Sequence, residues 1–172
     1  QSTFIPASDD GYVRGGQYVS ANFDTATAGN GLRIRASKTQ DNWRKVYIKF
    51  DLSGYSDTVG HATLSIWLDR ALGTGYNAIT NPSADTARFY KVSDDNWSEG
   101  TITWNTAPVA GEYLFTQAFR HRITADPDTM YTWDVTSYVR EKFAGNKTVT
   151  FLLMDANPGT GGASIAIDTT HN

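Results

Sequence analysis

Residues 31–52 alternate apolar and polar side chains with a period of two, in two separate runs. The apolar residues share one side, which holds Leu32, Ile34 and Ala36 in the first run and Val46, Ile48, Phe50 and Leu52 in the second. The other side holds Arg33 and Arg35, then Lys45, Tyr47, Lys49 and Asp51. Half-buried β-strands produce this alternation. The polar connector Lys38–Trp43 is short enough for a hairpin loop, so we expect the two runs to pair.

The outer face of this hairpin would be strongly basic. Opposite residues on paired strands lie about 5 Å apart, so the cationic side chains would adjoin. Like charges at that distance repel, and the arrangement costs stability unless an anion bridges them. The hairpin therefore predicts one of two things. It is either a face that binds an anionic ligand, or a solvated face whose charges interleave with acids on a third strand.

The rest of the chain is typical of an all-β protein. Short runs rich in Val, Ile, Tyr, Phe and Trp are separated by Gly, Asn, Asp and Pro, which favours an antiparallel β-sandwich or barrel. A length of 172 residues favours one domain, residues 1–172, with a sizeable core. We expect further strands at 3–6, 11–14, 63–69, 86–92 (with a bulge), 101–105, 131–135, 148–154 and from Ser164. Long loops are expected at 15–30 and 70–85, and a turn at Asp9-Asp10-Gly11.

One short helix is expected after the strand at 131–135. Tyr138, Val139 and Phe143 recur at helical spacing. Thr136 is the expected N-cap and Gly145 the expected C-cap. The pattern therefore predicts a helix over 136–145.

Composition excludes several classes of function. The formal net charge of −3 gives the molecule no overall attraction to nucleic acid or to an anionic membrane. The absence of cysteine excludes disulfides and thiolate metal sites. No apolar run approaches the ~20 residues of a membrane span, and no secretory signal is visible. The chain starts at Gln1 rather than Met, so we expect a mature or excised piece.

A series of motifs in a fixed order resembles one known family. The motifs are Asp10-Gly-Tyr-Val-Arg14, Gly31-Leu-Arg-Ile-Arg35, Tyr47-Ile-Lys-Phe-Asp-Leu-Ser53, Ala62-Thr-Leu-Ser-Ile66, Trp97-Ser-Glu-Gly-Thr-Ile-Thr-Trp-Asn105 with Pro108, and Trp133-Asp-Val-Thr136. Together they resemble the DNRLRE, or disaggregatase-related, domain, whose members include carbohydrate-binding module family 96. The resemblance covers roughly residues 9–168. The segments beginning at Tyr47 and Trp97 carry most of its specificity.

The resemblance implies a jelly-roll-like β-sandwich that binds sugar without catalysis. It further implies a secreted or cell-surface location, attachment to a larger polysaccharide-degrading enzyme, and an acidic polysaccharide ligand, alginate first. We expect a monomer. A sulfated galactan such as porphyran is the alternative ligand. A jelly-roll polysaccharide lyase and a structural or adhesion domain are the alternative functions. The lyase is disfavoured because Tyr47-Ile-Lys49 only weakly matches the expected Tyr-x-Lys-x-Gly strand, and a Gln-x-His strand is missing.

The candidate binding residues follow from charge and alternation. Arginine holds carboxylates and sulfates through a bidentate fork and lysine supplies a point charge, so the cations of the hairpin are expected to hold the anions. Lys49 has a competing role in the fold. Trp67 points outward in the 63–69 run, and an exposed Trp is costly unless it is covered or used. The expected ligand-binding residues are Arg33, Arg35, Lys45, Tyr47, Lys49, Trp67 and Arg14. Trp97, Trp104 and Trp133 are expected in the core.

A structural calcium ion is a further expectation, by analogy with other β-sandwich sugar binders. The expected oxygen ligands are Asp10, Asp24 and Asn30, with Asp168 added if the ends of the chain meet. The alternative is that these Asp and Asn residues serve turn chemistry alone.

Overall fold

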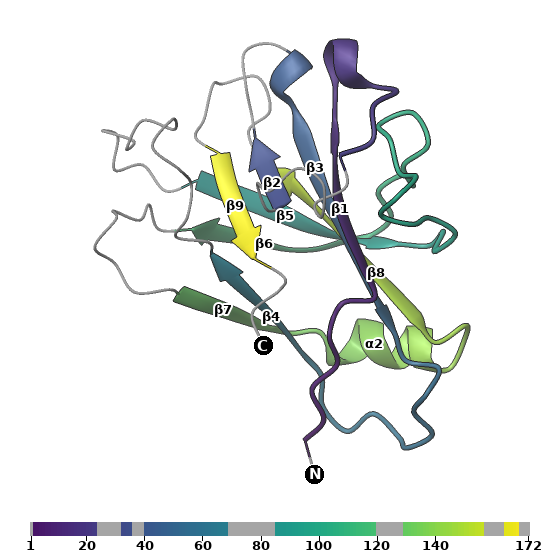
Figure 1. Ribbon diagram of the computed structural model, residues 1–172. Helices are drawn as coiled ribbons and strands as arrows, with labels where there is room; N and C mark the ends of the chain where they lie inside the picture. The colour runs from purple at the N-terminus through teal and green to yellow at the C-terminus, as the bar shows by residue number, and fades with distance from the viewer. Residues whose placement is uncertain are drawn as a thin grey trace.

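The computed structural model describes residues 2–23, 32–35, 40–68, 85–119, 129–156 and 164–168, with backbone only for 33–35, 42, 68, 85, 129 and 164–168. Within these ranges the chain forms strands, one α-helix and two short 3-10 helices (Figure 1). The strands are β1 (Asp9–Arg14), β2 (Leu32–Arg35), β3 (Arg44–Asp51), β4 (Thr63–Leu68), β5 (Asp85–Val92), β6 (Tyr113–Phe119), β7 (Thr129–Asp134), β8 (Thr148–Asp155) and β9 (Ser164–Asp168). The helices are η1 (Gly16–Tyr18), η2 (Gln40–Asn42) and α2 (Thr136–Phe143).

The strands form two antiparallel layers. The first sheet has the order β6-β5-β8-β3-β1, and the second has the order β2-β9-β4-β7. A single residue pair, Arg35 of β2 opposite Arg44 of β3, joins the two sheets at one corner. The expected antiparallel β-sandwich with one short helix is therefore confirmed (Figure 1).

The main core lies between the two sheets. Val46 and Ile48 of β3, Phe151 of β8, and Leu64 and Ile66 of β4 are each at most 3 % exposed. These residues occupy the faces that the period-two pattern assigns to the interior. Burying an aliphatic or aromatic side chain of this size contributes about 1.5–3 kcal/mol. The inward face predicted for residues 46–52 is confirmed, and β4 and β8 also direct alternate residues into this core.

A second apolar cluster covers the opposite face of the first sheet. Tyr47, Val92 and Leu152 point away from the main core, yet Trp97 and Ile102 of the segment 93–112 pack over them. We call residues 93–112 the cover segment. Tyr47 is 1 % exposed, and its hydroxyl donates a hydrogen bond to the carbonyl of Pro108 at 2.6 Å. The prediction that Tyr47 faces solvent is wrong because alternation assigns a side but does not reveal what covers it.

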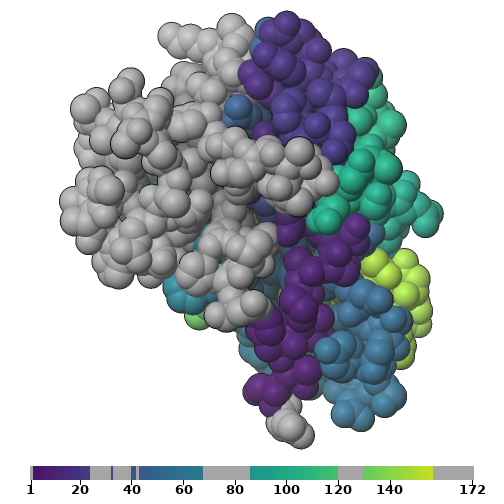
Figure 2. Space-filling model, viewed as in Figure 1, coloured from purple at the N-terminus to yellow at the C-terminus, as the bar shows by residue number. Residues whose placement is uncertain are grey.

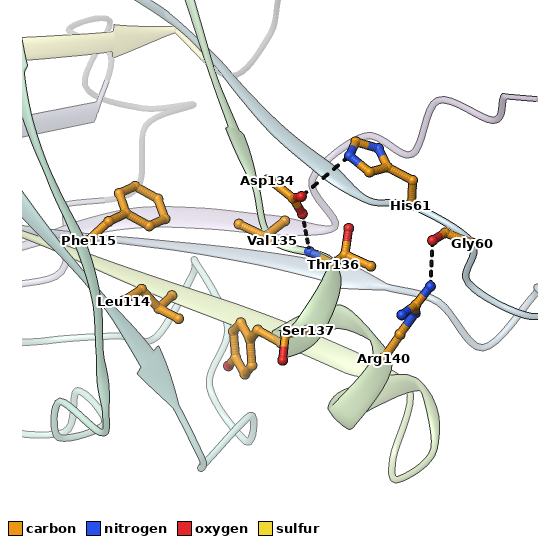
Figure 3. Close-up of a pocket in the computed structure, with 10 residues that line it drawn as sticks. Gly60, His61, Leu114, Phe115, Asp134, Val135, Thr136, Ser137 and Arg140 are labelled. Carbon is orange, nitrogen blue, oxygen red and sulfur yellow. Dashed lines mark hydrogen bonds and ion pairs between the residues drawn. The ribbon is translucent and has the colours of Figure 1, made fainter.

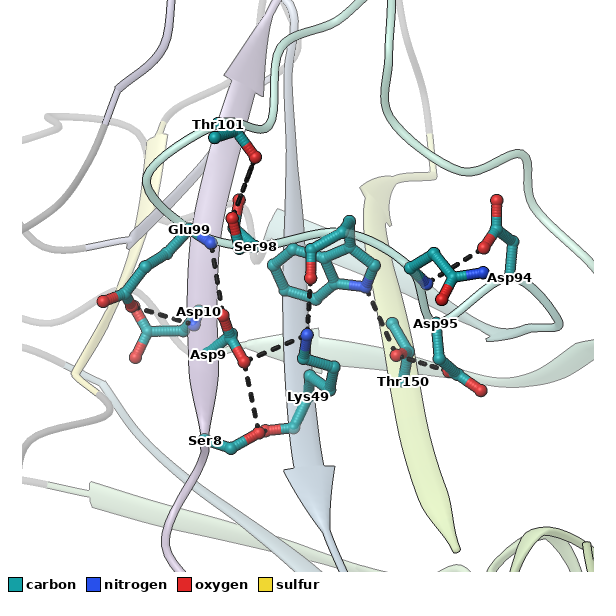
Figure 4. A network of polar contacts seen from close by, with 12 residues as sticks. Ser8, Asp9, Asp10, Lys49, Asp94, Asp95, Ser98, Glu99, Thr101 and Thr150 are labelled. Carbon is teal, nitrogen blue, oxygen red and sulfur yellow. Dashed lines mark hydrogen bonds and ion pairs between the residues drawn. The ribbon is translucent and has the colours of Figure 1, made fainter. Parts of the chain in front are cut away.

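A buried polar network holds the start of the cover segment in place (Figure 4). Asp95 accepts hydrogen bonds from Lys142 at 2.7 Å, Asn146 at 2.8 Å and the Thr150 hydroxyl at 2.8 Å. The Thr150 hydroxyl in turn accepts a bond from the Trp97 indole at 3.3 Å. One carboxylate thus links the cover segment to α2 and β8.

Several local expectations are corrected. The strand expected at 101–105 is a series of turns within the cover segment, and 3–6 is not a strand. Asp9-Asp10-Gly11 is not a turn but the start of β1, which pairs along β3. The bulge expected in 86–92 is confirmed by a register shift between Phe89 and Tyr90.

The helix is confirmed, with a different N-terminal cap. Thr136 is the first helical residue, and its backbone N–H donates to the Asp134 carboxylate at 2.9 Å. The Thr136 hydroxyl accepts a bond from the Ala62 N–H at 2.9 Å instead of capping the helix. Hydrogen bonding to Thr136 holds the pKa of Asp134 below its ordinary value. Within the described residues, no helix is long and apolar enough to cross a membrane.

Two buried tyrosines predict that the folded protein loses stability at alkaline pH. Burial raises the pKa of Tyr138 to about 12 and also raises the pKa of Tyr47. In the unfolded chain tyrosine ionises at a pH of about 10. The stabilisation is therefore complete below about pH 10 and is lost as the pH rises toward about 12. We expect the melting temperature to fall over that window while the absorbance of tyrosinate rises.

The variant Tyr138→Phe should flatten this alkaline decline, at the cost of lower stability at neutral pH, because the Tyr138 hydroxyl bonds to the carbonyls of Val92 and Thr150. The matched control is Tyr113→Phe, since Tyr113 is 51 % exposed. A melting temperature that stays constant across the window would contradict the prediction.

Candidate functional site

The predicted basic hairpin does not form as expected. β2 pairs with β3 only at Arg35 opposite Arg44, and otherwise lies against β9. Both edges of β3 are taken, one by β1 along residues 44–49 and the other by β8 along residues 45–51. A strand edge accepts one partner at a time, so Arg33 does not stand across from Lys45 or Lys49. The side chains of Arg33 and Arg35 lie outside the described part of the structure.

Lys49 serves the fold. Its ammonium group forms an ion pair with Asp9 at 3.0 Å, donates to the backbone carbonyl of Trp97 and lies 4.8 Å from the centre of the Trp97 ring (Figure 4). The side chain is 13 % exposed. The structure therefore shows the alternative that the sequence left open, a role for Lys49 in the fold. Its charge is already paired with Asp9.

Lys45 lies on the same outer face but makes a different contact. Its ammonium group sits over the Trp104 ring at 4.1 Å from the centre. Burial lowers the pKa of Lys45 from its ordinary value. Lys45 forms no ion pair with a carboxylate in the described ranges, so it keeps an unneutralised charge beside an aromatic ring.

Arg14 lies on the opposite face. In the β1–β3 register Arg14 stands across from Arg44, one residue away from the pair Val13–Lys45. Side chains directly opposite each other share a face of the sheet. The Arg14 guanidinium stacks on the Tyr18 ring at 3.6 Å and donates to the backbone carbonyl of Asp41 at 2.6 Å. Arg14 therefore does not join Lys45 and Lys49.

The structure brings together a different pair of cations, Arg14 and Arg44. Their backbones are neighbours across β1 and β3, and the backbone of Arg35 is the next neighbour across β3 and β2. Sequence reasoning missed Arg44. One feature of the sequence could have identified it. Arg44 lies two residues before Val46, so its guanidinium falls on the apolar side of the strand.

Two tight turns hold this arginine pair at the tip of the sandwich, at the top of Figure 1. The N–H of Gly15 donates to the carbonyl of Trp43 at 3.0 Å, which ties η1 to η2. Gly16 has a φ of +61°, and a side chain there would overlap Asp41. Only glycine adopts this positive φ without strain and has no side chain to overlap Asp41. The Gly15-Gly16 pair thus lets η1 approach η2 and fixes Asp41 beside Arg14.

Arg44 is buried without a partner for its charge. The residue is 7 % exposed, and its Nε and Nη1 atoms form no hydrogen bond. The Tyr12 ring, 5.7 Å away, is the contact recorded for its guanidinium. A buried polar group that lacks a partner costs about 1–3 kcal/mol, and more when it is charged. An oxyanion that reached this position would supply the opposite charge and accept hydrogen bonds that the guanidinium does not otherwise make.

Trp67 is half-buried on β4, on the outward side that alternation predicts. It lines a groove of about 220 Å³ with Phe50, Ile66 and Met130, whose other wall is the N-terminal segment 4–7. Figure 2 shows this N-terminal segment in purple on the surface of the lower half of the molecule. The described residues that line the groove are mainly apolar and include no cation.

The expected calcium ligands stay a prediction. Asp10 lies in β1, and its backbone N–H donates weakly to Glu99 at 3.4 Å. Asp24 and Asn30 lie outside the described residues, and only the backbone of Asp168 is described, opposite Trp67. Among the described side chains there is no group of three or more His, Asp or Glu residues that could hold a metal ion.

A groove of about 730 Å³ lies between β6, the end of β7 and the start of α2 (Figure 3). His61 and Asp134 pair across its rim at 3.6 Å, and Arg140 donates to the carbonyls of Val59 and Gly60. Phe115 lines the groove, but its ring stacks on Phe89 at 4.5 Å and on Trp133 at 5.4 Å. Because these rings occupy the stacking positions and the rim groups are engaged, the groove is a weaker sugar site than its volume suggests.

The two-sheet antiparallel arrangement of the described strands defines the class of all-β sandwich proteins. The sequence model of carbohydrate-binding module family 96 matches residues 1–172, the whole chain. The chain belongs to carbohydrate-binding module family 96, and the resemblance stated from the sequence motifs is confirmed.

One curated relative is a gellan lyase from a Bacillus species. It is 31 % identical to this chain over 135 residues, which is 76 % of the chain. The aligned part is 5 % of the gellan lyase, so the chain corresponds to a small part of that much longer protein.

Proposed function

We propose that this module binds an acidic polysaccharide and that Arg44, beside Arg14, holds one of its carboxylates. The observation that carries the proposal is the buried Arg44 guanidinium, whose Nε and Nη1 atoms have no partner. Membership of a carbohydrate-binding family supplies the class of ligand. A uronate carboxylate supplies the negative charge and two oxygens that accept hydrogen bonds from a guanidinium fork.

The relative supports an acidic ligand, since it is named for its action on gellan, an acidic polysaccharide. We propose alginate, expected from the family resemblance, and gellan as the two ligands to test first. The same reasoning makes the chain a targeting module of a larger extracellular enzyme. In that role it holds the enzyme on its substrate and leaves bond cleavage to another domain.

Affinity electrophoresis tests the proposal. We expect alginate or gellan in the gel to retard the module, and a neutral glucan to leave its mobility unchanged. Retardation should weaken as ionic strength rises from about 0.1 M to about 1 M, because the Debye length then falls from about 10 Å to about 3 Å. Arg140→Gln is the matched charge control, since Arg140 lies in the groove of Figure 3 and should not affect retardation.

Three results would count against the proposal. Unchanged mobility with every acidic polysaccharide would overturn it. Retardation by a sulfated galactan but not by alginate or gellan would replace the carboxylate with a sulfate ester. Unsaturated products after incubation with alginate or gellan would show a lyase instead of a binding module.

A further inference from the structure

The outer face of the first sheet is only partly covered. The cover segment packs over Tyr47, Val92 and Leu152, and leaves the row beyond them partly exposed. In register, Arg88 of β5 stands beside Met154 of β8, which stands beside Lys45 of β3. We call the open region the outer platform; its residues are Lys45, Arg88, Tyr90, Trp104, Tyr113 and Met154.

The outer platform combines aromatic rings with charges that lack acidic partners. Tyr113 is 51 % exposed, and its ring packs edge-on against Tyr90 with 6.0 Å between ring centres. Arg88 is exposed and makes no hydrogen bond or ion pair with the part of the chain that the structure describes. Lys45 lies over Trp104. Rings of this kind offer an apolar surface to the C–H face of a sugar, with polar tips at the edge.

Charge on the platform is of one sign. The register row Thr116–Arg88–Met154–Lys45 contains no acid, and neither does the adjacent row Tyr113–Tyr90–Leu152–Tyr47. Arg88 and Lys45 are two strand spacings apart, which is about 10 Å. A chain carrying repeated carboxylates complements this pair of cations, whereas a neutral or cationic chain does not.

The outer platform is separate from the arginine pair at the tip. Arg44 and Lys45 are consecutive residues of β3, so their side chains leave the sheet on opposite faces. Arg44 belongs to the side of Tyr12 and Val46, which is the inner face. A single sugar residue therefore cannot touch both Arg44 and Lys45.

We infer that the outer platform is a second polysaccharide-binding face, so that one module holds two segments of acidic polysaccharide, one at Arg44 and one across Arg88, Tyr113 and Lys45. The inference rests on the proposed function and extends it from one site to two. Two sites on opposite faces of one sheet allow a single module to cross-link neighbouring chains. Linked sites also raise overall retention beyond the affinity of either site alone.

Titration calorimetry with a short alginate oligosaccharide tests the second face. We expect two equivalents bound per wild-type module and one for the double variant Arg88→Gln/Tyr113→Ala. Truncating an arginine or aromatic anchor typically lowers affinity by about tenfold or more. Both side chains are exposed, so the double variant should keep its melting temperature. Tyr55→Ala, at 37 % exposure, is the matched aromatic control.

The outcomes separate this inference from the proposed function. A single equivalent on the wild type, or a titration of the double variant that matches the wild type, overturns the second face alone. No heat and no retardation with any acidic polysaccharide overturns the proposed function, and the second face with it. Precipitation of alginate by the wild type, but not by the double variant, supports cross-linking through the outer platform.

Discussion

Replacing Arg44 with methionine should make this module more stable and a poorer binder. Methionine fills a similar elongated volume without a charge. The wild-type guanidinium is 7 % exposed, with two nitrogens unpaired, so its removal should raise the free energy of unfolding by roughly 1–3 kcal/mol. Few substitutions at buried positions stabilise a protein, because most of them remove favourable contacts. A gain at Arg44 would mark a residue kept for binding rather than for folding.

The loss of affinity should be the larger effect. Truncating one member of a buried charge pair costs about 2–5 kcal/mol, which corresponds to a weakening of about 30-fold to a few thousand-fold. Urea denaturation measures the stability, and affinity electrophoresis on alginate and gellan measures the binding.

Arg44→Lys is the informative companion variant. It retains the charge but loses the bidentate fork, so it should show weakened retention and no gain in stability. An Arg44→Met variant that is both less stable than the wild type and fully retained would contradict the role given to this residue.

Removing the charge of Asp95 should cause the largest loss of stability. The Asp95–Lys142 ion pair is buried, with side-chain exposures of 7 % and 12 %. Asp95→Asn leaves the Lys142 ammonium buried without a counter-ion, and breaking such a pair costs about 3–5 kcal/mol. Because Asp95 also receives the Thr150 hydroxyl that accepts from Trp97, the cover segment should loosen. We therefore expect a lower urea midpoint together with a change in tryptophan fluorescence.

Two further variants sharpen this test. Asp94→Asn is the matched control, since Asp94 is exposed and caps only the N–H of Asn96, and its effect should stay within about 0.5 kcal/mol. Adding Lys142→Met to Asp95→Asn should recover part of the loss, because the unpaired charge is gone. Equal effects of Asp94→Asn and Asp95→Asn would contradict the role assigned to the network.

The sandwich could be predicted because its signals are local. Alternation over 46–52, 63–69 and 148–154 reports which side chains a strand buries, whatever its neighbours are. Strand partners are not local, and this is why the hairpin prediction failed. Proximity in sequence favoured β2 as the neighbour of β3, but β1 takes one edge of β3 over residues 44–49 and β8 takes the other over residues 45–51. Nothing in the alternation of either strand distinguishes these two choices.

The candidate site was harder to predict than the fold. Charged residues were interpreted as facing solvent, and Arg44 was therefore not considered. Lys49 was predicted to bind a ligand, whereas its observed partner is Asp9. One sequence signal did warn that the outer face is covered. Phe151-Leu-Leu-Met154 is apolar without alternation, and such a run indicates a sheet that packs against something on each face. The structure agrees, since residues 149–153 are all buried. The cover segment supplies that second layer without forming a strand.

The irregular backbone of the cover segment separates the residues that border the outer platform from the strand pairs that hold the sheets together. Residues 93–112 form no strand of either sheet, and the Asp95 network and the bonds between Lys91 and residues 111–112 secure their ends. Substitutions around Trp104 can therefore reshape the border of the outer platform while the strand ladders stay in register. A module built this way can change the surface of this one irregular stretch while its strand pairing stays the same.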